Sequence, residues 1–300
     1  MNKKEIYYKF FKENILPKII PLENKRKNSI KKASLISIIF FILGILFSVV
    51  FIFNINNNKF NPITFPLLQF FTYFFFIKSI INIIITSREY KNKIEHEIEP
   101  LFNTPIANFT KWPKGLDIDA ILSSGLFFNF DSAESSSCNF GIYANTNIII
   151  SNAQINLPTR GISKPTLFKG TLIQLELPFN TNNHIILTSK TEPKCNTYKK
   201  ITSNIQELNK FMHIYIQKET PNFITQELWE AVKSLAFAFD AKSILISINY
   251  NTVLIAIKHK NNNKFININS SLTNIKNYDE LIEKFIAIYN FVDYTTSLHS

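Results

Sequence analysis

The sequence predicts an α+β fold, in which an N-terminal two-helix transmembrane hairpin is followed by a cytoplasmic domain of antiparallel sheet packed with helices. Two long apolar stretches near the N-terminus, flanked by basic residues, indicate the hairpin. Alternating strand-like and helix-like patterns in the rest of the chain indicate the sheet and its helices. We therefore divide the 300 residues into segments 1–32, 33–86, 87–111 and 112–300.

Segment 1–32 is a basic amphipathic arm. It holds ten Lys or Arg residues against three Glu, so most of the net charge of +11 belongs to it. A nucleic-acid-binding protein should carry its basic residues on the folded domain, and here they lie beside an apolar stretch instead. We therefore expect anionic lipid headgroups as the partner and no nucleic acid. The expected membrane-surface residues are Lys25, Arg26, Lys27, Lys31 and Lys32.

The apolar residues Ile6, Phe10, Phe11 and Ile15 lie on roughly one side of a helix in this arm. This pattern fits an amphipathic anchor in the membrane interface, and it also fits a short helix that is either solvated or packed on protein.

The hairpin is predicted from spans at about 33–53 and 63–86. The first span has 21 residues without a charge, and at about 1.5 Å per residue it covers the roughly 30 Å hydrocarbon core. A polar link, "NINNNKFNP", leads to the second span. A buried soluble helix is as apolar as either span, but two such stretches in succession favour a transmembrane pair.

Lys78 lies within the second span and tests this prediction. A central lysine costs about 2.5–3.5 kcal/mol on insertion, and each Leu, Ile, Phe or Val contributes about 0.3–0.6 kcal/mol. The span holds 15 such residues, together worth roughly 4.5–9 kcal/mol. Insertion is therefore favourable. Lys78 is a membrane-embedded polar residue whose long stem carries the amine toward the headgroups.

Basic residues before the first span and after the second predict that both termini are cytoplasmic and that the short loop is outside. Segment 87–111 is a charged helical stalk. Segment 112–300 is the cytoplasmic α+β domain, either one unit or two subdomains at 112–205 and 206–300.

In the first half of this domain we predict strands over 147–157, 166–177 and 184–190, and a Ser-rich loop over 131–139. In the second half we predict strands over 212–217, 243–248, 252–258 and 265–269. A helix over 225–239 has Thr225 as its N-cap. The last helix, 279–292, has an apolar stripe that suits the core or a dimer seam.

A search for chemical motifs yields no catalytic, cofactor-binding or metal-binding residues. The six glycines are too dispersed for GxGxxG or a P-loop. Cys138 and Cys195 form no CxxC pair. The candidates with no recognisable partner are His96, His184, His213, His259, His299, the Ser123–Ser124 pair and the Asp117–Asp119 pair.

Several stretches together resemble an uncharacterised bacterial membrane family, catalogued as domain of unknown function 3137. They are "YYKFFKENILPKIIPLENKRKNSIKKA", "SSGLFF", "TLFKGTLIQLEL" and "HIYIQKETPNFITQELWEAV". The resemblance covers nearly the whole chain and implies a family motif at Phe168, Lys169 and Gly170. Where the family is expected to have an acidic, Gly-containing stretch, this chain has "AESSSCNFG". Lys169 could bind an anion, or it could be an edge-strand lysine or a salt-bridge partner.

We interpret the chain as a non-enzymatic, two-pass protein of the bacterial inner membrane. Its hairpin would tether a cytoplasmic domain that binds a partner protein or a lipid surface. The expected protein contact is either with a different protein or with further copies of this chain in a homo-oligomer. The alternative is a membrane-tethered enzyme that acts on a lipid-linked or cytosolic substrate at a site assembled only by the fold.

Overall fold

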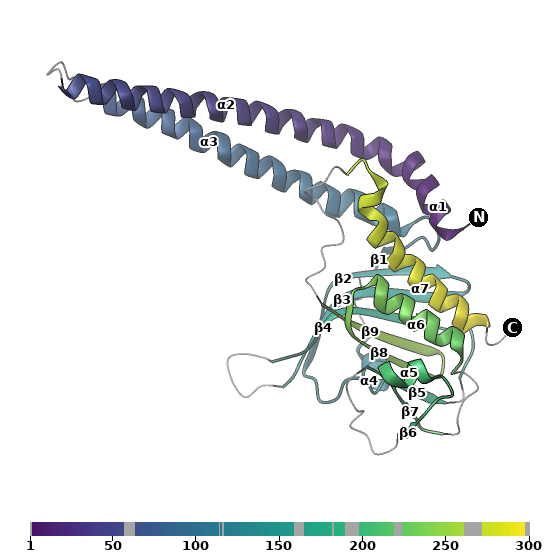
Figure 1. Cartoon of the computed structure of the whole chain (residues 1–300). Coiled ribbons are helices and arrows are strands. Elements are labelled where there is room, and N and C mark those ends of the chain that lie inside the picture. Colours follow the sequence, from purple (N-terminus) through teal and green to yellow (C-terminus); the bar gives the residue numbers. More distant parts are fainter. Residues whose placement is uncertain are drawn as a thin grey trace. The chain divides into compact units, whose positions relative to one another are not determined.

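Figure 1 shows the computed structural model, which describes residues 2–56, 64–113, 115, 117–158, 165–181, 183–189, 198–218, 224–260 and 272–297. The chain divides into two compact units. The α+β unit comprises Met1–Tyr8, Phe102–Asn267 and Lys276–Ser300, and the hairpin unit comprises Lys9–Leu101 and Ile268–Ile275. The α+β unit therefore includes the first eight residues, which the sequence alone assigns to the basic arm.

The hairpin unit consists of two long helices that pack side by side, α2 (Leu16–Asn56) and α3 (Thr64–Lys93). Shorter helical segments flank them: η1 (Phe11–Ile15), η2 (Ile94–Ile98) and η3 (Glu99–Asn103). Among the described residues, two helices are long and apolar enough to cross a membrane, and only 6% and 11% of the residues in their most apolar stretches are buried. A core helix of a soluble protein would be mostly buried, so this exposure favours a transmembrane pair.

Polar side chains of the two helices lie inside the hairpin. The Gln69 side-chain amide donates to Ser48 Oγ at 3.0 Å, and Ser48 Oγ donates to the Gly44 carbonyl at 2.8 Å. Ser79 Oγ donates to the Ala33 carbonyl on the other helix. Large apolar side chains point outward instead, among them Leu35, Ile38, Phe41, Ile45, Ile52, Phe70, Phe74, Ile77 and Ile84. An arrangement with polar side chains inside and apolar side chains outside is the reverse of that in a soluble protein, and it suits a lipid environment.

The α+β unit is built on an antiparallel sheet that has nine strands among the described residues, in the order β1-β2-β3-β4-β9-β8-β5-β7-β6. The strands are β1 (Thr110–Lys111), β2 (Ser132–Tyr143), β3 (Thr146–Asn156), β4 (Thr166–Glu176), β5 (His184–Thr188), β6 (Lys199–Ile201), β7 (His213–Ile216), β8 (Ala241–Asn249) and β9 (Thr252–His259). The predicted α+β class is confirmed. Because β4 pairs with β9, strands from both halves of segment 112–300 form one sheet.

Helices cover both faces of the sheet. α6 (Gln226–Ala238) and α7 (Asp279–Ser297) lie side by side on one face, close to the short α5 (Gln206–Phe211) and η4 (Ile275–Tyr278). On the other face, Ile121 of α4 (Ile118–Ser123) packs in a core cluster with Leu254 and Ala256 of β9. The alternating residues Val253 and Ile255 point to the opposite face and are also buried. The core therefore has two layers, one on each side of the sheet.

The predicted elements of the C-terminal half are largely confirmed, because their local signals agree with their packing. Thr225 caps α6, and its Oγ1 accepts the Leu228 N–H at 3.4 Å. The predicted stripe of the last helix is buried, at Leu281, Phe285, Ile288 and Val292. The predicted strand at 265–269 lies outside the described residues.

The predicted Ser-rich loop at 131–139 is wrong. This stretch forms most of β2, which pairs with β3 from Ser132 opposite Asn156 to Tyr143 opposite Thr146, with a register shift between Ser135 and Ser137. Small polar residues favour loops locally. Here the long backbone ladder to β3 outweighs that preference, because strand propensity depends strongly on context.

The N-terminal helix α1 (Lys3–Phe10) begins in the α+β unit and contacts α7 there. Tyr7 is 1% exposed, and its ring stacks on Phe285 at 6.3 Å. Lys4 Nζ pairs with Glu283 at 2.6 Å, and the Tyr8 hydroxyl donates to Asp279 at 2.7 Å.

Farther along the arm, Phe11 and Ile15 are buried within the protein. An interfacial anchor would present these apolar side chains to lipid. The structure therefore supports the protein-packed interpretation of the arm.

Candidate functional site

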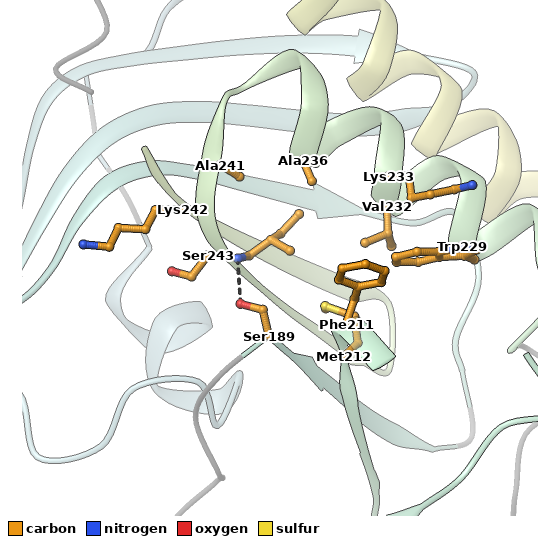
Figure 2. Close-up of a pocket in the computed structure, with 11 residues that line it drawn as sticks. Ser189, Phe211, Met212, Trp229, Val232, Lys233, Ala236, Ala241, Lys242 and Ser243 are labelled. Carbon is orange, nitrogen blue, oxygen red and sulfur yellow. Dashed lines mark hydrogen bonds between the residues drawn. The ribbon is translucent and has the colours of Figure 1, made fainter. Parts of the chain in front are cut away.

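The α+β unit contains a groove whose lining residues are all described. Its volume is about 300 Å³, at the low end of the usual range for ligand pockets. It lies between the end of α5, one side of α6 and the start of β8 (Figure 2). The lining residues are Ser189, Phe211, Met212, Trp229, Val232, Lys233, Ala236, Ala241, Lys242, Ser243 and Ile244. We call this site the α5–α6 groove.

Two aromatic rings form one wall of the α5–α6 groove. Trp229 is 5% exposed, and its indole Nε1–H donates to Glu207 Oε2 at 3.0 Å. Figure 2 shows the Phe211 ring next to Trp229. The two rings are stacked, with centroids 5.8 Å apart and planes 17° apart. Phe211 itself is 63% exposed. The wall is therefore a fixed apolar surface with a solvent-facing edge, because the buried indole has its polar atom satisfied.

Two lysines supply the charge of the groove, and their situations differ. Lys233 Nζ lies 5.4 Å from the centre of the Trp229 ring and pairs with Glu230 at 2.6 Å and with Glu207 at 3.8 Å. This hydrogen bond from Lys233 lowers the pKa of Glu230. Lys242 is exposed and makes no ion pair with any described residue. Lys242 is thus the lining cation whose charge is still available to a ligand, and Figure 2 shows its side chain extending outward at the β8 end, away from Trp229 and Phe211.

The polar groups of the groove suit binding better than acid–base catalysis. Its lining holds two serines and two lysines, and no carboxylate, histidine or cysteine. Ser189 Oγ accepts the Ile244 N–H at 3.2 Å, so it links β5 to β8. A nucleophile needs an adjacent general base, and no histidine or carboxylate among the lining residues serves either serine.

His184 and Ser124 are two candidates for which the sequence shows no partner. They lie close together on the face of the sheet opposite the α5–α6 groove. His184 Nε2 lies 3.0 Å from the Ser124 carbonyl oxygen and 2.9 Å from Ser247 Oγ, and Nδ1 lies 2.9 Å from the Tyr198 hydroxyl. A carbonyl only accepts, so Nε2 carries the proton and Nδ1 accepts from Tyr198. In this tautomer the imidazole cannot take a proton from Ser247.

Burial lowers the pKa of His184, which keeps its ring neutral, and Ser247 is also buried. A buried hydroxyl beside a protonated nitrogen has neither the base nor the access that a nucleophile needs. We therefore interpret this cluster as a structural network that ties β5 to β8 and to the end of α4.

The expected membrane-surface residues fall into two groups. Lys25, Lys31 and Lys32 are exposed, as a membrane-surface role requires. Arg26 instead faces Glu23, with its Nη2 2.8 Å from Glu23 Oε1. Lys27 is exposed and lies 3.5 Å from the same carboxylate. Part of the basic cluster is thus neutralised within the hairpin unit.

Glu23 is the centre of a polar clamp that the sequence analysis missed. It is 1% exposed and accepts a hydrogen bond from the Tyr90 hydroxyl of α3 at 2.6 Å. Burial alone would raise the pKa of Glu23, but hydrogen bonds from Arg26 and Tyr90 lower it to about 2. The clamp joins α2 to α3 just outside the predicted spans. A single Glu in a basic segment carries no local signal of such burial.

Lys78 is exposed on the outside of the hairpin, where its neighbours Ile77 and Ile81 are also exposed. Among the described residues it makes no ion pair. Its outward position is compatible with the predicted extension of the amine toward headgroups.

The three residues of the family motif lie in β4 and have separate roles. Phe168 is buried and packs on Phe127 at 5.3 Å. Lys169 is exposed, opposite Gln154 of β3. A Cβ at Gly170 would overlap the Ile257 carbonyl oxygen of β9. Phe168 and Gly170 are therefore packing residues, and they do not form a joint site with Lys169.

The remaining candidates have structural explanations or lie outside the described residues. Asp117 caps α4 by accepting the Asp119 N–H at 3.0 Å. Burial raises the pKa of the Cys138 thiol, which makes it a poor nucleophile. Among the residues that the structure describes, no three His, Cys, Asp or Glu side chains are placed to hold a metal ion. The His96 side chain, Cys195 and His299 are not described.

No family model matches this chain, and no curated protein or solved structure matches it either. The resemblance to the family of unknown function therefore stays a prediction.

Proposed function

We propose that this chain is a two-pass membrane protein whose hairpin tethers a cytoplasmic α+β domain that binds a partner protein. The inside-out polarity of the α2–α3 hairpin carries this proposal. Its apolar side chains point outward along both helices, whereas Ser48, Gln69 and Ser79 bond within the pair. Exposed apolar surface of this extent calls for a lipid or protein environment, and two adjacent helices of spanning length favour lipid.

The contacts of the N-terminus support an even number of crossings. Lys3 pairs with Asp293, and Lys4 pairs with Glu283, both on α7 near the C-terminus. These contacts join segments that precede and follow the hairpin, which supports the same side of a membrane for both segments. A hairpin inserted between Tyr8 and Phe102 satisfies this condition.

The basic residues support the cytoplasmic side. Lys25, Lys31 and Lys32 are exposed just before the first span, where the positive-inside rule favours the cytoplasm and anionic headgroups attract lysines. The predicted bacterial inner membrane rests on the family resemblance as well as on this charge pattern.

The α5–α6 groove supports a binding role over the alternative of a tethered enzyme. Its wall consists of Trp229 and Phe211, residue types that are enriched in protein interfaces. Its only titratable side chains are Lys233 and Lys242. An enzyme site usually pairs an acid, base or nucleophile with a second group that activates it, and no histidine, cysteine or carboxylate lines this groove.

Reporter fusions test the topology. We expect a cytoplasmic reporter such as GFP to be active at both termini, and a periplasmic reporter such as alkaline phosphatase to be active only within residues 57–63. The protein should also remain in the membrane fraction after alkaline extraction. Periplasmic activity at the C-terminus, or release by alkali, would contradict the proposal.

A further inference from the structure

We propose that the α5–α6 groove binds an extended segment of a partner protein that presents a bulky apolar side chain and, farther along the segment, a carboxylate. This inference rests on the proposed function and specifies its partner. The apolar side chain would fill the groove against Trp229, and the carboxylate would pair with Lys242.

The apolar part follows from the shape and composition of the groove. Its surface is mostly apolar, and its lining includes Phe211, Met212, Trp229, Val232 and Ile244. Figure 2 shows that the Phe211 and Trp229 rings lie next to each other, and the Trp229 indole N–H donates a hydrogen bond to Glu207. A volume of about 300 Å³ accepts one or two side chains. Such a preformed aromatic pocket is typical of sites that receive an anchor residue.

Exposed aromatic surface beside the groove favours a protein over a small ligand. Phe237 is 90% exposed and follows Lys233 by one turn on α6, directly after the lining residue Ala236. Phe211 is also largely exposed. A ligand enclosed by the groove would leave Phe237 in water, whereas a protein segment that crosses the groove would cover both rings. Exposed aromatic residues of this kind mark interaction surfaces.

The requirement for a carboxylate follows from the charges at the two ends of the groove: Figure 2 shows Lys233 beside Trp229, and Lys242 at the β8 end with its side chain directed away from the aromatic wall. Lys233 is already paired with Glu230 and Glu207. Lys242 is the extra residue at the register shift between Ala241 and Ser243, where β8 is paired with β9. A bulge of this type redirects a side chain away from the regular strand. A rim charge of this kind contributes specificity and association rate, so we expect it to select an acidic residue farther along the segment.

Site-specific photo-crosslinking in the native cells tests this inference with the full-length chain. We replace Phe237, beside the groove, with p-benzoylphenylalanine. The matched control is the same replacement at Leu122, which is 54% exposed on α4 at the other face of the sheet. We expect a specific protein adduct at Phe237 and none at Leu122. Mass spectrometry should locate the adduct in a segment with a large apolar residue within three positions of Asp or Glu.

The other outcomes distinguish failure of the groove proposal from failure of the proposed function. An adduct only at Leu122 would contradict partner binding at the groove, but it would still support a domain that binds a protein. A lipid adduct at Phe237 would overturn the protein partner and favour a lipid surface. The absence of an adduct at both positions would overturn the groove and the proposed function together.

A synthetic peptide of the crosslinked segment then tests the chemistry on the full-length protein in lipid nanodiscs. Lys242→Glu should weaken its binding at least tenfold, and Ala236→Leu, which fills the groove, should do the same. Lys169→Glu is the charge-matched control, because Lys169 is exposed on β4, and it should change binding less than twofold. Equal binding by wild type and both groove variants would overturn the assignment.

Discussion

Replacement of Tyr7 by alanine should destabilise the α+β unit although Tyr7 lies at the far N-terminus. Tyr7 is 1% exposed and stacks on Phe285 of α7. Removal of a large buried aromatic ring costs about 3–5 kcal/mol, because its apolar contacts are lost and a cavity remains. For a unit of this size, that change lowers Tm by about 6–20 °C.

Tyr7→Phe separates the ring from the hydroxyl. The Tyr7 and Tyr289 hydroxyl oxygens are 3.4 Å apart, which is long for an O–H···O hydrogen bond. We therefore expect Tyr7→Phe to cost less than about 1 kcal/mol. Lys9→Ala is the control, since Lys9 is exposed in the same helix.

Intrinsic fluorescence is a suitable measurement, because both tryptophans of the chain, Trp112 and Trp229, belong to the α+β unit. Urea unfolding of the full-length protein in detergent micelles would compare the free energies of unfolding, provided that the transition is two-state. If Tyr7→Ala and Lys9→Ala both fall within about 1 kcal/mol of wild type, the N-terminal helix does not pack on α7 and the reasoning fails.

Three further predictions concern the hairpin and the sheet. Lys78→Leu should leave membrane insertion intact in an alkaline-extraction assay, because it replaces the costliest residue of the span; reduced insertion would show that Lys78 is needed there. The folded-state pKa of Glu23 is about 2, below its usual value of 4.5. The ionised carboxylate therefore makes its full contribution to hairpin stability above pH 4.5, and this contribution is lost as pH falls toward 2. The stability of the hairpin can be followed across a pH series by crosslinking α2 to α3. In Glu23→Gln the loss of stability at low pH should be absent, and a pH profile equal to that of wild type would refute the proposed role of Glu23. Gly170→Ala should destabilise the α+β unit by about 1–3 kcal/mol or more, because the added Cβ forces β4 away from the Ile257 carbonyl of β9; wild-type stability in urea would contradict this packing.

Local sequence signals account for much of the fold. The two apolar helices follow from length and hydropathy, and α6 and α7 follow from the spacing of apolar residues, with Thr225 as a cap. Each of these signals lies within one segment and does not depend on what the segment later contacts. The antiparallel sheet follows in outline from several short strand patterns joined by turns.

The candidate site could not be predicted in the same way. Phe211, Trp229 and Lys242 belong to three elements, and the sequence does not reveal that their side chains surround one groove. The nearest signal is Trp229 within an amphipathic helix, which by itself indicates only burial. Likewise, nothing local marks Glu23 as buried, because its partner Tyr90 lies on the other helix of the hairpin.

The sequence by itself determined that the chain has two long apolar helices, a basic segment before them and an α+β domain after them. Only the tertiary structure decided that the Ser-rich stretch 131–139 is a strand, because its stability comes from pairing with β3. The tertiary structure also decided that Tyr7 belongs to the core beside α7. Hydropathy and periodicity are properties of one segment, whereas the partner that buries a side chain or completes a backbone ladder is supplied by a distant part of the chain.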